Sequence, residues 1–394
     1  MLGLAQIFGK ETVAGVDIGS RWIKVVQAEA QGPGRWRIGK AGLAPTPENA
    51  VHDGVVVEPA AVGSAIRELM KASSIEANGA AAAISGASVI VRHVKMPRMA
   101  EAVLRKSVRF EAAKYISTSV EDSLIEFEIT GPVPGEDDKM GVMLVAAPQD
   151  MVESRLAALS HAGLTPVAVD VEAFALQRAL LDLSATRPGE GATLALLDIG
   201  AASTDVNIVT DGRFALTRNI DYAGDHFTKA LQALHPQADR AQLEQIKREV
   251  DMSALLSPDA GLEAQSLARA VQPVMDELLR EVRRSINYYQ SQLMDPANSN
   301  LPAGVTAETG GGTVSRIVVT GGSARMAGLE AYMAARLGLP VEAWNVCDNP
   351  AFDMTALAPS FLSENAALLT TGMGLALKEL TEAPAAKGRR AKAA

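Results

Sequence analysis

This chain of 394 residues is poor in several features that would place it in particular classes of protein. Cys347 is its only cysteine, which excludes an internal disulfide and favours a reducing compartment. Acidic residues outnumber lysine and arginine, and the resulting net charge of −9 argues against broad nucleic-acid binding, which needs a basic face. Aromatic residues make up only 4% of the chain. The cores must therefore rely on aliphatic side chains, and the abundant alanine and glycine suit close packing of helices on sheets.

Long apolar runs and familiar catalytic motifs are also missing. No apolar stretch reaches the roughly 18–20 residues of a membrane span, and the opening residues lack the basic region of a signal peptide. The five histidines show no metal-binding spacing. Neither a G-x-S-x-G nucleophile elbow nor a Walker A motif occurs. The composition predicts a globular protein without a membrane span, long enough for two or more domains.

One pattern occurs twice: a β-rich apolar run that ends in Asp-Ile-Gly and turns into a second strand. The two copies are Asp17-Ile18-Gly19-Ser20 and Asp198-Ile199-Gly200-Ala201, and seven residues after each Asp stand Lys24 and Asp205. Glycine at the turn lets backbone N–H groups approach a phosphate closely, and the carboxylates would act through a divalent cation and its waters. One such turn alone is usually an ordinary hairpin. Two copies at matching spacing predict two hairpins that grip a nucleoside triphosphate from both sides.

Two further motifs have both a functional and a purely structural interpretation. Gly321-Gly322-Ser323 follows an apolar strand, so it predicts either a bare backbone for an adenine and its phosphates or a turn that needs positive φ. Glu244, Lys247 and Arg248 share one helix face. They predict either contacts with a ribose and base or a solvated face with intrahelical ion pairs.

Glu172 and Lys24 are the remaining charged candidates. Glu172 opens a helix, where it would ordinarily favour the helix dipole, but between the two hairpins it could orient the water that attacks a γ-phosphate. Lys24 lies within an apolar strand and needs a partner, which a phosphate would supply.

The complete set of candidates adds the neighbours of these residues in the turns. For ATP binding they are Gly19, Ser20, Lys24, Gly200, Ala201, Ser203, Thr204, Gly224, Glu244, Lys247, Gly321, Gly322 and Ser323. For a metal ion they are Asp17, Asp198 and Asp205, and for catalysis Glu172 and Asp198.

The segment between the two hairpins reads β-α-β-β-α-β, the order of a ferredoxin-like module inserted into a larger domain. A short segment at 2–8 contains Leu2, Leu4, Ile7 and Phe8, and we expect it to pack on the body of the protein or to touch a membrane. The expected division is a first lobe (11–88, 168–190 and a closing helix at 365–380), the module (89–167), a second lobe (191–225 and 315–364) with a helical subdomain (226–314), and a disordered tail (381–394).

Taken in order, these motifs resemble the actin-like ATPase superfamily. Asp17 to Lys24 is similar to its phosphate-1 motif, Asp198 to Asp205 to phosphate-2, and Gly321-Gly322-Ser323 to its adenosine motif. The helices near Glu172 and Asn365 resemble its two connecting helices. The resemblance implies an α/β, actin-like (ribonuclease H-like, duplicated) two-lobed ATPase fold with an inserted ferredoxin-like βαββαβ subdomain. It also implies ATP and Mg²⁺ as cofactors.

Within the superfamily the chain is most similar to the PilM family of type IV pilus assembly. The most specific segments are Ala14–Ser20, Arg105–Ile116 and Val169–Ala175, and the position of the insertion also fits. The resemblance implies a cytoplasmic ATP-binding scaffold, peripheral to the inner membrane, with at most slow ATP hydrolysis. Its implied partner is the N-terminal cytoplasmic tail of PilN, bound in a groove between the main lobe and the module. Pilus motor ATPases, the platform protein and further copies of the chain are additional expected partners.

Two alternatives compete with this interpretation. One is a filament-forming division or cell-shape protein of the FtsA or MreB type; FtsA proteins usually carry a C-terminal amphipathic membrane helix, which residues 378–394 do not offer. The other is a small-molecule kinase, which needs an acceptor pocket with a catalytic Asp that the sequence does not reveal.

Overall fold

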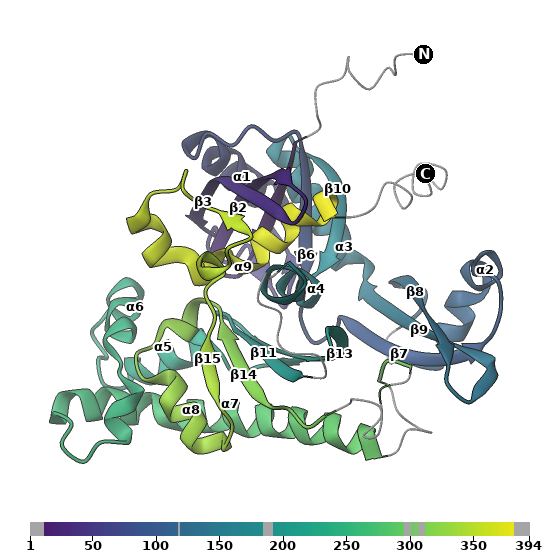
Figure 1. The fold of residues 1–394 in the computed structure, drawn as a ribbon. Helices are drawn as coiled ribbons and strands as arrows, with labels where there is room; N and C mark the ends of the chain where they lie inside the picture. Colours follow the sequence, from purple (N-terminus) through teal and green to yellow (C-terminus); the bar gives the residue numbers. More distant parts are fainter. Residues whose placement is uncertain are drawn as a thin grey trace. The chain divides into compact units, whose positions relative to one another are not determined.

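The computed structural model describes residues 12–116, 119–183, 192–294, 301–303, 305 and 312–381. The chain divides into two compact units (Figure 1). Unit 1 comprises Met1–Ile84, Asp150–Arg187 and Asn345–Ala394, and unit 2 comprises Ser85–Gln149 and Pro188–Trp344. The apolar segment at 2–8 and all but the first residue of the expected tail at 381–394 lie outside the described residues.

Unit 1 is built on a six-stranded sheet of order β10-β6-β1-β2-β3-β16. The strands are β1 (Val13–Ile18), β2 (Trp22–Gly32), β3 (Arg35–Pro45), β6 (Gly79–Ile84), β10 (Thr165–Val171) and β16 (Phe352–Asp353), with a small separate hairpin β4 (Val51–His52) and β5 (Val55–Val56). β1, β2 and β3 form an antiparallel meander, whereas β6 pairs parallel with both β1 and β10. The meander is the strand–turn–strand pattern expected around Asp17.

Helices cover both faces of this sheet. α1 (Pro59–Ala72) begins with Pro at its first turn, where the missing N–H costs nothing. It packs with α3 (Gln149–Ala162) in one core. On the other face α4 (Glu172–Gln177), a π-helical turn (Arg178–Asp182) and α9 (Pro359–Thr381) are the two expected connecting helices. α9 begins six residues earlier than expected, and it lies so close to β1 that a Cβ on Gly15 would stand 2.0 Å from the Gly372 carbonyl oxygen.

Unit 2 contains a five-stranded sheet of order β13-β12-β11-β14-β15. Its strands are β11 (Thr193–Ile199), β12 (Thr204–Thr210), β13 (Arg213–Ile220), β14 (Arg316–Thr320) and β15 (Val341–Ala343), and its helices are α5 (Gly224–Gln232), α6 (Arg240–Glu249), α7 (Leu262–Met294) and α8 (Leu329–Leu337). Apolar residues of the sheet and of α5, α7 and α8 form the largest core, which includes Ile208, Phe227 and Met275. A 3₁₀ turn (Gly322–Arg325) precedes α8.

The inserted module lies in unit 2 and consists of β7 (Ile90–Pro97), α2 (Glu101–Ala112), β8 (Ser123–Val133) and β9 (Glu136–Pro148). Its sheet has the order β7-β9-β8, with Leu104 and Val108 of α2 packed on one face. The expected β-α-β-β-α-β module is therefore wrong in its last two elements. α3 packs in the core of unit 1, and β10 pairs with β6. Element order alone cannot distinguish these arrangements, because it does not specify which sheet edge accepts the last strand.

One buried histidine joins the module to the five-stranded sheet of unit 2. His93 of β7 is 6% exposed, and its Nε2 lies 2.8 Å from the carbonyl oxygen of Phe214 in β13. Since a carbonyl only accepts, Nε2 carries the proton and donates. Burial lowers the pKa of His93 to about 4. The positive charge of Arg213 lowers this pKa further, whereas the hydrogen bond to Phe214 raises it. His93 is therefore neutral at neutral pH.

In the part of the chain that the structure describes, no helix combines the length and the apolar character needed to cross a bilayer.

Candidate functional site

The phosphate-1 candidate of unit 1 is the β1–β2 turn. Asp17 and Lys24 are direct cross-strand partners, and Lys24 Nζ lies 2.8 Å from Asp17 Oδ2. The Gly19 N–H donates to the Trp22 carbonyl oxygen, and Thr46 Oγ1 donates to the Gly19 carbonyl oxygen at 2.7 Å. Lys24 thus has the partner that its position in an apolar strand requires, and Asp17 supplies it. The same ammonium group stands 3.0 Å from the place a Cβ on Gly19 would occupy, directly at the turn.

Glu172 opens α4 in the same unit. Thr371 Oγ1 of α9 donates to Glu172 Oε1 at 3.3 Å, so the two connecting helices meet at this carboxylate. A further charged residue was not predicted: Arg155 of α3 is 3% exposed and donates from Nε to the Ala83 carbonyl oxygen at 2.6 Å. It also donates to the carbonyl oxygens of Gly54 and Met151.

The side chain of Arg155 is a buried cation whose pKa depends on the carboxylates of Glu172 and Asp17. Burial lowers its pKa to about 10, and the negative charges of Glu172 and Asp17 oppose that shift. Sequence reasoning missed Arg155, although a signal was present. The signal is a charged residue on an apolar helix face: Arg155 lies on the same face as Met151, Ala158 and Ala162.

The phosphate-2 candidate of unit 2 is the β11–β12 turn. Asp198 and Asp205 are direct cross-strand partners, so two carboxylates stand side by side at the end of the hairpin. Asn219 Nδ2 of β13 donates to Asp205 Oδ1 at 2.9 Å. The Gly200 N–H closes the turn onto the Ser203 carbonyl oxygen, and Thr204 Oγ1 donates to the Tyr222 carbonyl oxygen at 2.7 Å.

Three motifs far apart in the sequence converge at this turn. The Gly224 N–H and the Ser323 hydroxyl both donate to the Gly200 carbonyl oxygen, at 3.0 and 3.2 Å. A Cβ on Gly224 would lie 2.6 Å from Ser323 Oγ. A Cβ on Gly321, whose φ is +92°, would lie 2.1 Å from Asp198 Oδ1. Only glycine allows this close approach of backbone to backbone and carboxylate.

The ribose candidates Glu244 and Lys247 of α6 contact the start of α5 and so belong to the same cluster. The Asp225 N–H donates to the Ala201 carbonyl oxygen at 2.8 Å. Lys247 Nζ of α6 lies 2.7 Å from Glu244 Oε2 and donates to the Gly224 carbonyl oxygen at 3.2 Å. Thr228, which sequence reasoning missed, accepts from Lys247 at 2.9 Å and donates to Glu244 at 2.7 Å. The intrahelical ion pair and the position beside the glycine cluster are therefore both present.

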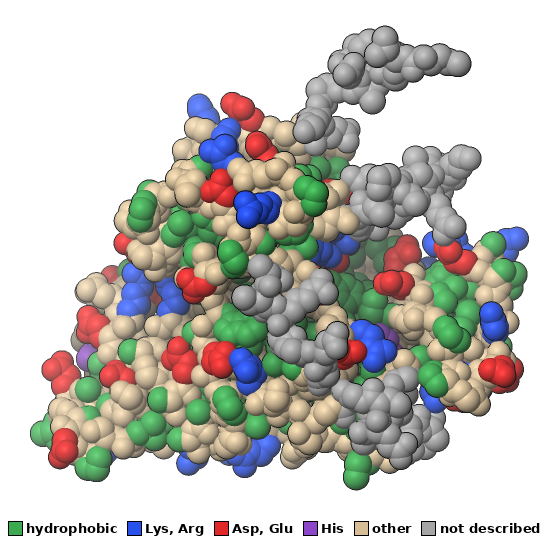
Figure 2. Space-filling model, viewed as in Figure 1, with side chains coloured by type: hydrophobic (Ala, Val, Ile, Leu, Met, Phe, Trp, Pro, Cys, Tyr) green, Lys and Arg blue, Asp and Glu red, His purple; other side chains and the backbone are tan. Residues whose placement is uncertain are grey.

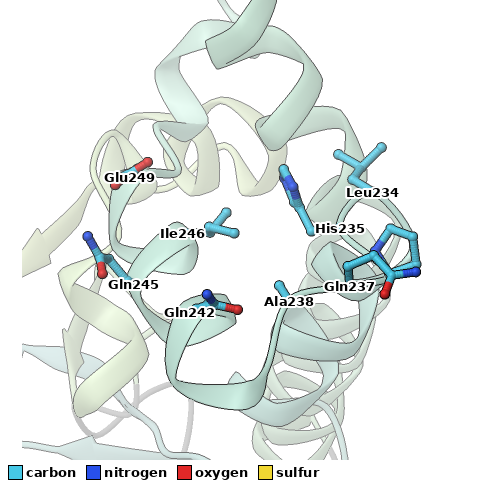
Figure 3. Close-up of a pocket in the computed structure, with 9 residues that line it drawn as sticks. Leu234, His235, Gln237, Ala238, Gln242, Gln245, Ile246 and Glu249 are labelled. Atoms are coloured by element: carbon cyan, nitrogen blue, oxygen red, sulfur yellow. The ribbon is translucent and has the colours of Figure 1, made fainter.

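The opposite face of α6 lines a shallow surface cavity of about 570 Å³ (Figure 3). Gln242 and Ile246 of α6 lie on one side of it, and His235 and Ala238 of the α5–α6 connection on the other. Helical spacing places Glu244 and Lys247 away from this cavity. The cavity is therefore separate from the glycine cluster.

The candidates fall into two groups, one in each unit. Asp17, Gly19, Ser20, Lys24 and Glu172 belong to unit 1, and the remaining candidates, from Asp198 to Ser323, belong to unit 2. Among the residues that the structure describes, no three His, Cys, Asp or Glu side chains gather closely enough to hold a metal by themselves. A cation would need oxygen ligands from a nucleotide or water in addition to the Asp198–Asp205 pair, which is how Mg²⁺ usually binds beside phosphates.

A β-hairpin with an Asp-Ile-Gly turn in each of two mixed sheets, with a third glycine motif beside the second, defines the actin-like ATPase fold. Solved structures agree. The ethanolamine utilization protein EutJ from Carboxydothermus hydrogenoformans superposes with a TM-score of 0.53 at 18% identity, over 94% of this chain and 90% of that one. MreB 5 of Spiroplasma citri bound to AMPPNP superposes with a TM-score of 0.51 at 10% identity, over 98% of this chain and 100% of that one.

The chain belongs to the family described as type IV pilus assembly protein PilM, which matches residues 15–380. A chain of the solved PilM-PilN type IV pilus biogenesis complex is 27% identical, with a TM-score of 0.77 over 94% of this chain and 99% of that one. This match favours the PilM family over the FtsA and MreB alternative.

Proposed function

We propose that this protein is an ATP-binding scaffold of type IV pilus assembly that binds the N-terminal cytoplasmic tail of PilN. The observation that carries the nucleotide part is the convergence of Gly224 and Ser323 on the carbonyl oxygen of Gly200, with Gly321 against Asp198. Such a surface, where Gly200, Gly224 and Gly321 leave the backbone without Cβ atoms, suits the close approach of a flat base and a phosphate chain.

The residues of unit 2 have distinct roles in this proposal. Gly321, Gly322 and Ser323 form the platform for the adenosine, and the turn from Gly200 through Thr204, with the start of α5 at Gly224, receives the phosphates. Lys247 and Glu244 already contact Thr228 and the Gly224 carbonyl oxygen, so a ribose hydroxyl there would exchange one of these hydrogen bonds for another.

The phosphate-1 hairpin of unit 1 is the second phosphate-binding candidate in this proposal. Lys24 supplies a cation at the Gly19 turn, and Asp17, Asp198 and Asp205 are the carboxylates that would hold hydrated Mg²⁺. Glu172, positioned by Thr371, is the candidate that would orient a water for slow hydrolysis.

The partner proposal is supported by the similarity to the PilM-PilN complex over nearly the whole of both chains. A tail of PilN would hold the scaffold at the cytoplasmic face of the inner membrane. Nucleotide binding can change the affinity for such a partner, because a ligand shifts the equilibrium between conformations that it binds with different affinity.

The experiment is a calorimetric titration of the full chain with a synthetic peptide of the PilN N-terminal tail, with and without Mg-ATP. We expect saturable binding of the tail and no binding of a scrambled peptide of the same composition. An affinity that changes with Mg-ATP supports nucleotide coupling. Absence of tail binding in both conditions would contradict the partner assignment, and absence of ATP binding would contradict the nucleotide site.

A further inference from the structure

The helix of the inserted module has an outward face that the proposed function does not use. α2 buries Leu104, Val108 and Ala112 in the module core. Its opposite face carries Val103, Lys106, Phe110 and, just past the end of the helix, Lys114. We call these four residues the α2 ridge. Their spacing of three, four and four residues places them along one line of the helix surface.

The ridge exposes large apolar side chains. Phe110 is 72% exposed and Val103 is 54% exposed, and they stand two helical turns apart. Single exposed apolar residues are ordinary on protein surfaces. Here two of them alternate with cations along one helix, and Figure 2 shows green and blue side chains together over the region of α2. This combination of exposed apolar and cationic side chains indicates a binding surface.

The ridge is cationic although the chain as a whole has a net charge of −9. Lys114 Nζ lies 5.3 Å from the Phe110 ring centroid and 2.8 Å from Glu111 Oε2. Lys106 forms no ion pair within the part of the chain that the structure describes. Beside the ridge, Arg109 donates to the Val120 carbonyl oxygen. A helix face that carries Lys106 and Lys114 beside an exposed aromatic ring complements a negatively charged surface.

We propose that the α2 ridge docks on anionic phospholipid headgroups at a bilayer surface. The ridge is the crest of a convex helix, so a soft interface can receive Phe110 and Val103 between headgroups while the lysines contact their phosphates. Cations near such a surface attract anionic lipid, and an aromatic ring is favourable at the boundary of headgroups and acyl chains. This contact is independent of the nucleotide site, and it adds a second, weaker contact to one made through a membrane partner.

The test is sedimentation of the full chain with vesicles, either of phosphatidylcholine alone or of phosphatidylcholine and phosphatidylglycerol in equal amounts. We expect association with the anionic vesicles only. Lys106→Ala should weaken it about fivefold at low salt and have little effect at high salt. Phe110→Ala should weaken it at both salt concentrations, because its contribution is not electrostatic.

Matched controls lie on other exposed helix positions. Leu262→Ala, at a side chain that is 87% exposed at the start of α7, and Lys71→Ala, in the last turn of α1, should leave vesicle binding unchanged. Equal binding to both kinds of vesicle, or equal loss in ridge and control variants, would overturn the proposal. So would capture of the ridge by an acidic polypeptide without any vesicle binding, which would assign the ridge to a protein partner.

Discussion

Gly321→Ala is the substitution that most sharply tests the glycine cluster of unit 2. Gly321 has φ of +92° and ψ of 172°, a conformation that is almost restricted to glycine and costs another residue about 1–3 kcal/mol. The added Cβ would also stand 2.1 Å from Asp198 Oδ1 and 2.7 Å from the Ile199 carbonyl oxygen. Relieving that overlap costs about 1–3 kcal/mol more. The expected loss in free energy of unfolding is therefore about 2–6 kcal/mol.

Gly212→Ala is the matched control. Gly212 also has positive φ, at +71°, but a Cβ there would meet no atom within 4 Å. Its variant should lose only about 1–2 kcal/mol, the cost of left-handed backbone alone. Urea unfolding followed by circular dichroism measures both losses, and calorimetry measures ATP binding. We expect weakened ATP binding in Gly321→Ala only. Equal losses of stability in the two variants, with ATP affinity intact in both, would refute the reasoning.

Three further predictions follow from individual contacts. Asp170→Asn should lower the free energy of unfolding by about 3 kcal/mol, because Asp170 Oδ2 lies 3.0 Å from Arg178 and 3.4 Å from Lys378 and the substitution removes the negative charge beside both cations; urea unfolding tests this. The pKa of His93 is 6.5 in the unfolded chain and about 4 in the folded protein, so the free energy of unfolding should fall by about 3 kcal/mol as the pH falls between these values. His93→Gln should remove this part of the pH dependence. Lys247→Met should weaken ATP binding about tenfold in a calorimetric titration, because a charge-assisted hydrogen bond is lost, and an unchanged affinity would remove Lys247 from the site.

Sequence reasoning was most successful where chemistry and spacing coincide. The seven-residue interval in each motif matches two strands in antiparallel register, and the structure pairs Asp17 with Lys24 and Asp198 with Asp205. The position of Gly321 after a buried strand was likewise informative, because few other residues adopt its backbone conformation. The roles of these residues toward a nucleotide are still predictions.

The sequence was less informative where tertiary pairing decides the outcome. β10 completes the sheet of unit 1 instead of the module, since its local pattern suits either sheet edge. Arg155 lies on the apolar face of α3, but it was overlooked because two of the carbonyl oxygens that satisfy its guanidinium, those of Gly54 and Ala83, lie far from it in the sequence. The π-helical turn after α4 has no sequence signature that separates it from a continuous α-helix.

The most direct test of the account is ATP affinity, measured by calorimetry in the presence of Mg²⁺, for one variant in each unit. Asp17→Asn and Asp198→Asn keep the shape of the side chain and remove the charge proposed to hold the metal. We predict at least about a tenfold loss of affinity in each, and no change in Asp211→Asn, a control at the neighbouring β12–β13 turn. Unchanged affinity in both Asp17→Asn and Asp198→Asn would contradict the claim that these two hairpins bind the nucleotide.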